Sequence, residues 1–213
     1  MLIVNPERPI YATEPKQRTQ RPTVTGGSVI ALKYNGGVLI GCDTVMNQYY
    51  TKHKGISRIA KVDGNTLFCA SGDYADFQYM TQEFKAIHRR EQNAEDGVTH
   101  SPKDYCRYLG IPCSYSLIIY SAYANYAKRN KFDPNYMTSV VAGFKDGEGY
   151  IGYVDHIGTV IDKDYVLTGF ASYFCSPLII NNWKADMPLV DAIKIMENCF
   201  RVLFYRDKRA TDR

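Results

Sequence analysis

Two tight turn signals constrain the fold most strongly. Asn35-Gly36 and Asp63-Gly64 each separate two short runs rich in β-branched and apolar residues. Asx-Gly pairs adopt the turn conformations that join antiparallel strands through a two-residue loop. The paired runs are residues 28–34 with 37–44, and residues 56–62 with 66–70. The sequence therefore predicts two antiparallel hairpins, and their apolar density predicts a large cover on one face.

Helical spacing appears directly after the second hairpin. Phe77, Met80, Phe84 and Ile87 recur at intervals of three and four residues, after the possible N-cap Asp73. A second helical region is expected to begin at Ser101-Pro102, because serine caps a helix and proline suits its first turn. We expect it to continue to about residue 128, with an interruption at residues 110–112.

The rest of the chain returns to strand and then to helix. Strand-like runs are predicted at residues 138–144, 150–155 and 159–167. An apolar stripe at helical spacing follows, formed by Leu189, Ile193, Met196, Phe200 and Leu203. Two blocks of strands around two helices, followed by more helix, predict an α+β fold with helices on both faces of paired sheets.

Composition excludes several classes of function. The chain has 213 residues, of which 45% are hydrophobic, so a single domain with a sizeable core is expected. Its 26 basic and 22 acidic side chains are interspersed, so no nucleic acid partner is implied. The longest tyrosine-rich apolar stretch, residues 117–127, is too short and too polar to span a membrane. Residues 1–26 carry four prolines without a hydrophobic period, which indicates an extended arm.

The cysteines and histidines suggest no metal site. Six cysteines include no CxxC pair, and the four histidines lack ligand spacing beside them. The cysteines are Cys42, Cys69, Cys106, Cys113, Cys175 and Cys199. We interpret them as reduced core thiols of a cytosolic or nuclear protein, and we expect no cofactor.

Three segments, taken in order, carry a family resemblance. They are residues 19–34 (TQRPTVTGGSVIALKY), 71–79 (SGDYADFQY) and 201–207 (RVLFYRD). Together they resemble a β-type subunit of the 20S proteasome, most of all the seventh β-type member of the eukaryotic ring. The resemblance implies an N-terminal nucleophile hydrolase fold, a four-layer αββα sandwich with two antiparallel sheets. It divides the chain into an arm or propeptide-like segment, residues 1–26, and a β-type domain, residues 27–213, with an extra segment at residues 110–116.

The resemblance also implies a biological setting. Such a subunit assembles with α-type and other β-type subunits into a 28-subunit barrel in the cytoplasm and nucleus. Neighbouring subunits then degrade ubiquitin-tagged and unfolded proteins inside the chamber. The match suggests trimming of the arm at Arg18-Thr19. It implies no nucleic acid, membrane or cofactor.

Gly27 decides the expected catalytic status. Active β-type subunits expose an N-terminal threonine whose hydroxyl attacks the peptide while its own α-amine acts as base. The resemblance places Gly27 at that threonine, and glycine has no side-chain oxygen. Loss of the nucleophile from a hydrolase costs about a millionfold in turnover. We therefore predict a non-catalytic subunit.

The same resemblance shows that several other site positions carry residues different from those of an active subunit. Arg58 replaces a lysine, and arginine does not give up its proton. The remaining positions are the supporting aspartates Asp43 and Asp207, the oxyanion glycine Gly72, and Phe170 and Ala210 in place of supporting serines. Four of these residues also have a purely structural interpretation. Asp43 could be a hydrogen-bonded carboxylate, Gly72 could allow a tight turn, and Arg58 and Asp207 could pair with neighbouring charges.

Two rival functions remain open. An active peptidase could use Thr25 or Ser28 after cleavage just before it. Side chains alternate faces along a strand, so Ser28 points away from the face on which a side chain at position 27 would lie. Thr25 lies two residues before position 27, a distance of about 7 Å along the strand. An unrelated binding module or enzyme is the other class, but no phosphate loop, metal cluster or Ser-His-Asp signature supports it.

Aromatic residues suggest how an inactive subunit is used. The chain has 18 tyrosines, many of them between residues 105 and 126. Aromatic side chains dominate protein interfaces, so the arm and this region are predicted to dock onto neighbouring β-type subunits. The alternative interpretation, that the tyrosines facing the helices are internal, is equally compatible with the sequence.

Overall fold

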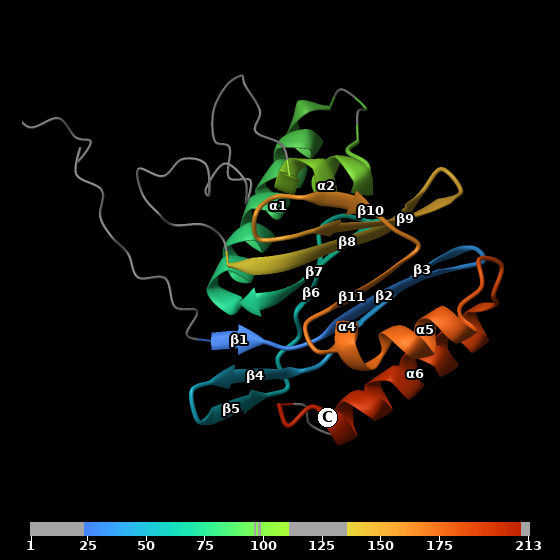
Figure 1. The fold of residues 1–213 in the computed structure, drawn as a ribbon. Coiled ribbons are helices and arrows are strands. Elements are labelled where there is room, and N and C mark those ends of the chain that lie inside the picture. The colour runs from blue at the N-terminus through green and yellow to red at the C-terminus, as the bar shows by residue number, and fades with distance from the viewer. Residues whose placement is uncertain (1–23, 96, 98, 111–135, 210–213) are drawn as a thin grey trace, which may run out of the picture.

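Four layers of secondary structure build the fold. The computed structural model describes residues 24–95, 97, 99–110 and 136–209. Two antiparallel sheets face each other, α1 and α2 cover the larger sheet, and α4, α5 and α6 cover the smaller one (Figure 1). The predicted α+β four-layer arrangement is confirmed. All but residues 24–26 of the predicted arm, all but residue 110 of the extra segment at residues 110–116, and the expected helix beyond residue 110 lie outside the described residues.

The larger sheet has eight strands in the order β10-β9-β8-β7-β1-β4-β5, with β6 paired to β7. Its strands are β1 (Val24–Gly26), β4 (Val45–Gln48), β5 (Thr51–Lys54), β6 (Ile59–Lys61), β7 (Thr66–Asp73), β8 (Met137–Lys145), β9 (Glu148–Val154) and β10 (Val160–Asp162). The smaller sheet has the order β11-β2-β3, formed by β2 (Val29–Tyr34), β3 (Gly37–Cys42) and β11 (Tyr165–Thr168). The helices are α1 (Tyr74–Ala94), α2 (Pro102–Gly110), α4 (Ala171–Phe174), α5 (Ser176–Asn182) and α6 (Leu189–Arg206).

Both predicted hairpins form. β2 pairs antiparallel with β3 around Asn35-Gly36, and Gly36 has a φ of 96°, which an L side chain rarely adopts. β6 pairs antiparallel with β7 around Asp63-Gly64, where Asp63 Oδ1 accepts a 2.6 Å hydrogen bond from the main-chain nitrogen of Asn65. These local turn signals therefore predicted the pairing correctly.

Two features of the strands differ from the sequence-based expectation. The run at residues 159–167 is two strands in two sheets, because β10 pairs with β9 while β11 crosses to β2. Lys33 holds the crossing point, since its main-chain nitrogen donates to Asp164 O at 2.9 Å and its Nζ donates to Asp164 Oδ1 at 2.9 Å. The β4–β5 hairpin was not predicted, because β5 is exposed throughout and has no apolar alternation.

Three hydrophobic clusters fill the three spaces between the layers. Phe68 of the larger sheet packs with Phe77 and Phe84 of α1 at ring-centroid distances of 5.4 and 4.9 Å. The cluster between the sheets includes Val29 and Ala31. The cluster under the outer helices includes their β2 neighbours Ile30 and Leu32 with residues of α6. β2 is thus buried on both faces, which is why its sequence is a continuous apolar run rather than an alternating one.

The first two tyrosines of the predicted interface region pack against the core. Tyr105 on α2 is fully buried, and its ring lies 5.5 Å from that of Phe84. Tyr108 is partly buried against the same cluster, with its ring 6.1 Å from that of Phe84. The interpretation of helix-facing tyrosines as core residues is therefore correct for Tyr105 and holds in part for Tyr108, while residues 111–126 lie outside the described part of the chain.

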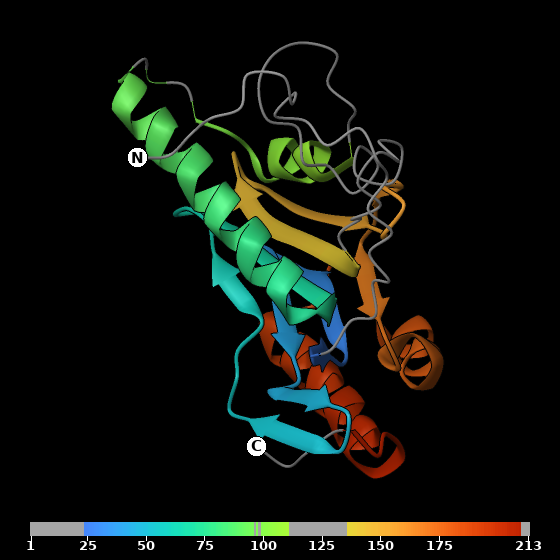
Figure 2. The same cartoon turned by 90° about the vertical axis from the view of Figure 1, so that its left-hand side faces the viewer.

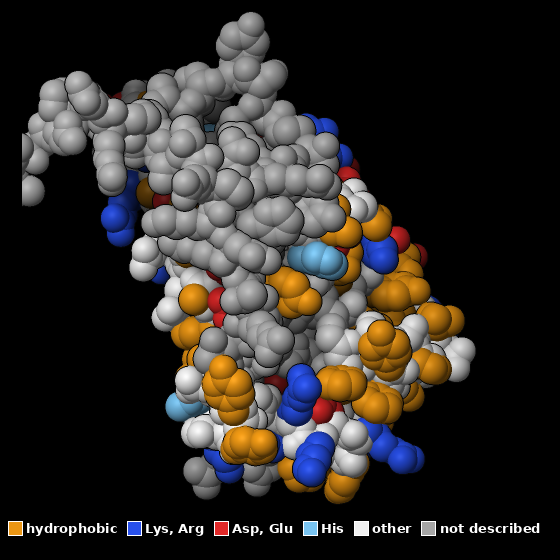
Figure 3. Space-filling model, turned by 60° about the vertical axis from the view of Figure 1, so that its left-hand side comes forward, with side chains coloured by type: hydrophobic (Ala, Val, Ile, Leu, Met, Phe, Trp, Pro, Cys, Tyr) orange, Lys and Arg blue, Asp and Glu red, His pale blue; other side chains and the backbone are white. Residues whose placement is uncertain are grey.

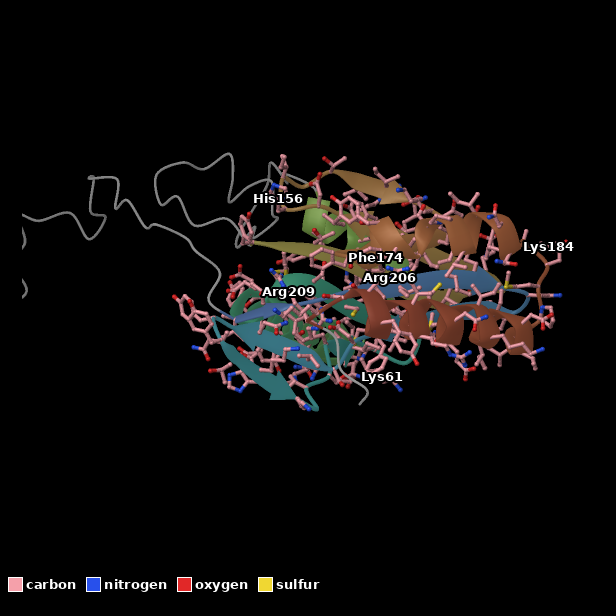
Figure 4. The ribbon with its side chains drawn as sticks, turned by 60° about the horizontal axis from the view of Figure 1, so that its bottom comes forward. Lys61, His156, Phe174, Lys184, Arg206 and Arg209 are labelled. Atoms are coloured by element: carbon pink, nitrogen blue, oxygen red, sulfur yellow. The ribbon has the colours of Figure 1, made fainter. Side chains whose placement is uncertain are left out.

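The outer helices bring the end of α6 back beside the β4–β5 hairpin of the larger sheet. α5 leads away from β11, and α6 returns antiparallel beside it, so that Arg206 lies at the end of the layer opposite Lys184 (Figure 4). The β4–β5 hairpin lies beside α6 at that end (Figure 2). Lys52 Nζ fixes the contact by donating to Lys208 O at 2.6 Å. Within the described ranges, no helix is both long and apolar enough to cross a membrane.

Candidate functional site

The candidate residues meet where β1 gives way to β2. Arg58, from the loop before β6, lies at the centre and is only 1% exposed. Its guanidinium donates to Ala70 O at 2.8 Å, to Asp43 O at 3.1 Å and to Ser28 O at 3.3 Å. It also forms an ion pair with Asp43 Oδ1. One cation therefore links three segments that are distant in sequence.

Two glycines leave the space that this arrangement needs. A Cβ at Gly26 would overlap Arg58, at 2.6 Å from its Nε. A Cβ at Gly27 would point at the Asp43 carboxylate, overlapping Oδ2 and lying 3.1 Å from Cγ. The Arg58–Asp43 pair therefore fills the region into which a side chain at position 27 would project.

The pKa of Asp43 is raised above its ordinary value. Burial raises the pKa of Asp43, the Arg58 guanidinium opposes that rise, and the nearby Asp207 carboxylate adds to it. Asp43 Oδ2 and Arg58 Nε are both buried without a hydrogen-bond partner. The pair is therefore held by one strong contact and several carbonyl oxygens, and not by a complete set of hydrogen bonds.

Gly72 lies beside the same junction. It pairs with Gly26 in the β1–β7 ladder, and its φ of +112° is open only to glycine. A Cβ here would lie 2.5 Å from Tyr136 O and 2.8 Å from Met137 Cα. Backbone conformation and close backbone contacts are therefore enough to require glycine at position 72.

Phe170 and Asp207 approach from the outer helices. Gly169 comes so close to Gly27 that a Cβ on it would lie 3.0 Å from Gly27 O, which places Phe170 beside the junction. The Arg209 guanidinium lies 5.5 Å from the centre of the Phe170 ring. Asp207 ends α6, and its Oδ1 accepts a 2.8 Å hydrogen bond from the Arg209 main-chain nitrogen.

The structure therefore brings six predicted positions together: Gly27, Asp43, Arg58, Gly72, Phe170 and Asp207. The seventh, Ala210, lies outside the described residues. Among the residues that the structure places, no group of three or more His, Cys, Asp or Glu side chains could hold a metal ion.

Thr25 and Ser28, the rival nucleophiles, have other surroundings. Thr25 lies within β1 and pairs with Asn47 on one side and Asp73 on the other. Ser28 is buried, and its Oγ accepts a 3.1 Å hydrogen bond from the Ala171 main-chain nitrogen. Its oxygen thus faces the outer helices, away from the direction of a Cβ at Gly27.

Sequence reasoning missed two parts of this region. Gly26 was not singled out, although the Gly26-Gly27 pair was a visible signal of close backbone approach. The second part is a pair of cysteines, the partly buried Cys42 of β3 and the buried Cys69 of β7, which belong to the same cluster between the sheets. Their partnership could not be predicted, because it joins strands of opposite sheets.

The matching family model is described as "Proteasome subunit" and covers residues 23–213 of the chain. The chain belongs to the proteasome subunit family. Proteasome subunit beta type-4 of Arabidopsis thaliana is 34% identical over 203 residues, which is 95% of this chain and 78% of the relative. Its Xenopus laevis namesake is 36% identical over 203 residues, with 93% and 78% covered.

A relative from yeast bears the other β-type name. Proteasome subunit beta type-7 of Saccharomyces cerevisiae is 30% identical over 205 residues, which is 92% of this chain and 74% of the relative. These names place the chain among the β-type members, as the three sequence segments predicted. The N-terminal nucleophile hydrolase fold expected from the resemblance is confirmed by the family and by the two antiparallel sheets between helices.

Proposed function

We propose that this chain is a non-catalytic, structural β-type subunit of the 20S proteasome core, with Gly27 at the position of the nucleophile. The observation that carries the proposal is the Arg58–Asp43 pair against Gly27. A threonine hydroxyl is absent at position 27, and the space that its side chain needs holds the Asp43 carboxylate. The β-type names of the relatives support the same assignment.

The chemistry of the remaining groups supports inactivity. Covalent peptide hydrolysis requires an attacking oxygen and a base within hydrogen-bond reach of it. The guanidinium of Arg58 donates to the carbonyl oxygens of Ala70, Ser28 and Asp43. Phe170 offers an aromatic ring at the position where the family resemblance places a supporting serine hydroxyl. The Ser28 hydroxyl, which accepts from Ala171, points to the other side of the strand.

The proposed role is assembly with other β-type and α-type subunits into a 28-subunit barrel, in the cytoplasm and nucleus. Exposed apolar side chains on the outer helical layer support such contacts, among them Tyr173, Ile180, Val190 and Tyr205. Figure 3 shows hydrophobic side chains lying next to Lys and Arg on one face. Apolar patches beside arginine are typical of protein interfaces.

Native purification of the tagged chain is the direct test of assembly. We expect α-type and other β-type proteasome subunits to co-purify in a particle near the mass of a 28-subunit barrel, because a closed ring needs its neighbours. Native mass spectrometry measures this. A monodisperse monomer at cellular concentration would contradict the proposed role.

Gly27→Thr is expected to create no peptidase. The new Cβ would force Asp43 away from its present position and weaken its pair with Arg58, and Arg58 cannot take the part of a lysine base towards the hydroxyl. A threonine-directed covalent inhibitor should therefore label active subunits of the same particle but not the variant chain. Gly27→Ser is the companion variant if Gly27→Thr is not incorporated. Labelling of either variant at position 27 would contradict the account.

An intact-mass measurement separates the rival peptidase from the proposal. An active hydrolase would be processed to begin at Thr25 or Ser28, whereas the proposed subunit requires neither end. Because Ser28 is buried and Thr25 lies inside the β1 ladder, we expect no mature chain that begins at either residue. Detection of one of those ends would favour the peptidase.

A further inference from the structure

One edge of the larger sheet is a strand without apolar side chains. β5 (Thr51–Lys54) ends the strand order of that sheet and, within the described ranges, pairs on one side only, with β4. All of its residues are exposed. In an antiparallel ladder every second residue turns its N–H and C=O away from the partner strand. The outer side of β5 therefore presents donors and acceptors that another strand can pair with.

Positive charge from two distant segments meets at this edge. Lys52 Nζ donates to Lys208 O at 2.6 Å, which holds β5 against the segment that follows α6. Figure 2 shows β5 beside the end of α6. Side chains alternate faces along a strand, so Lys54 lies on the same face as Lys52. We call the exposed cations Lys52, Lys54, Lys208 and Arg209 the basic edge.

The basic edge lacks a compensating carboxylate in the described part of the chain. No aspartate or glutamate occurs at residues 44–62. Asp43 and Asp207 flank the two segments, but the Asp43 side chain is 9% exposed and Asp207 is 6% exposed. Among the residues that the structure describes, no cation of the basic edge forms an ion pair. Other exposed lysines do pair with an aspartate, namely Lys33, Lys103 and Lys194.

The spacing of the charges favours an extended acidic segment as the partner. Lys52 and Lys54 lie two residues apart on one face, about 7 Å along the strand. Carboxylates on alternate residues of an added strand have the same spacing, and the main chain of that strand can pair with β5. A second copy of this chain would place lysine against lysine, which is unfavourable. A nucleic acid backbone has no amide donors for the C=O groups of the strand edge.

Two tyrosines at the tip of the hairpin extend this surface. Tyr49 and Tyr50 join β4 to β5, and both are exposed. Tyrosine rings bring a large contact area at small entropic cost and are common at protein interfaces. A segment that runs along β5 meets these rings at one end. The surface thus combines main-chain pairing along the strand, positive charge on one face and aromatic contact at the tip.

We propose that β5 is the docking edge for an acidic, extended segment of a partner protein, which adds to the larger sheet as a strand beyond β5. The basic edge selects carboxylates, and the main chain of β5 supplies the pairing. The same lysines keep this edge from pairing with a second copy of the chain while the partner is absent. The inference does not depend on the proposed function, because the edge belongs to the fold of this chain alone.

A synthetic peptide tests the edge on the full chain. The probe is a short fluorescent peptide in which glutamate and valine alternate, and anisotropy measures its binding. Each exposed ion pair contributes about 1.5- to 5-fold in affinity, so Lys52→Gln combined with Lys54→Gln should bind about 2- to 25-fold more weakly. The matched control combines Lys85→Gln with Lys184→Gln, because these lysines are exposed elsewhere on the fold. The control should bind like wild type.

Further probes separate strand addition from attraction by charge alone. Two N-methylated versions of the peptide, one for each set of alternate residues, keep the charges but lose amide donors. One of the two should bind about fivefold more weakly or worse. The proposal is overturned if the peptide does not bind at about 1 mM, or if the lysine double variant binds like the control. It is also overturned if both N-methylated versions, or a single-stranded oligonucleotide of the same charge, bind as tightly as the peptide.

Cross-linking of the natively isolated chain decides the question if the chain does not fold alone. A carbodiimide joins an amine to a carboxylate that it contacts, and peptide mass spectrometry assigns the joined residues. We expect lysines of the basic edge to be joined to aspartate or glutamate of another protein more often than Lys85 and Lys184 are. If they are joined only within this chain, or no more often than the two control lysines, β5 is not a docking edge.

Discussion

Replacing Arg58 with methionine is expected to lower the free energy of unfolding by about 3–5 kcal/mol, the usual cost of leaving one member of a buried ion pair alone. Methionine fills much of the volume but leaves the Asp43 carboxylate buried without its cation. The carbonyls of Ala70, Ser28 and Asp43 lose their donor at the same time. Urea denaturation of the purified chain measures the loss.

Two further variants show which part of Arg58 matters. Arg58→Lys keeps the charge but cannot reach several carbonyls at once, so its loss should be smaller than that of Arg58→Met. The double variant Arg58→Met with Asp43→Asn removes both charges, so it should be more stable than the sum of the two single losses predicts. If Arg58→Met stays within about 1 kcal/mol of wild type, the linking role assigned to Arg58 is wrong.

The contacts of Arg58 explain why arginine, and not lysine, suits this position. A lysine has one ammonium and cannot give the fork of donors that spans two sheets. The Arg58 guanidinium donates to the carbonyl oxygens of Gly27, of Asp43 just after β3, and of Ala70 in β7. It therefore stabilises the point at which the two sheets meet. Arg58 thus acts as a structural cross-link, which agrees with the proposed structural role of the chain.

Much of the fold could be predicted, because its signals are local. The Asx-Gly turns fixed two hairpins, and the spacing of Phe77, Met80 and Phe84 predicted α1 with its buried face. The β4–β5 hairpin was missed, because the strand Thr51–Lys54 is polar on both faces and owes its form to pairing with β4. The division between β10 and β11 depends on which sheet each strand joins, which no local pattern reports.

The candidate site was predicted by position but not by geometry. The family resemblance selected Gly27, Asp43, Arg58 and Asp207, and the structure brings them together from four separate segments. It could not reveal that Arg58 is fully buried on carbonyl oxygens or that Gly26 makes room for it. Those facts depend on how the two sheets approach each other, so only the three-dimensional structure contains them.

Gly72→Ala is expected to lower the free energy of unfolding by about 2–6 kcal/mol. Backbone strain at its φ of +112° accounts for about 1–3 kcal/mol. The contacts with Tyr136 O and Met137 Cα add about as much again, because backbone atoms cannot move aside as a flexible side chain can. Thermal or urea unfolding of the variant and wild-type chains measures the difference.

Two matched glycines separate the causes and decide what Gly72 is for. Gly36 has a φ of +96° but open space, so Gly36→Ala should show the strain alone, about 1–3 kcal/mol. Gly64 has open space and no such φ, so Gly64→Ala should be neutral or stabilise by up to about 1 kcal/mol.

Alanine keeps the main-chain N–H that an oxyanion site requires, so a purely catalytic role predicts an unchanged stability for Gly72→Ala. A loss larger than that of Gly36→Ala therefore assigns Gly72 to the packing of β7 against β1 and β8, and a loss no larger than that of Gly64→Ala rules this packing role out.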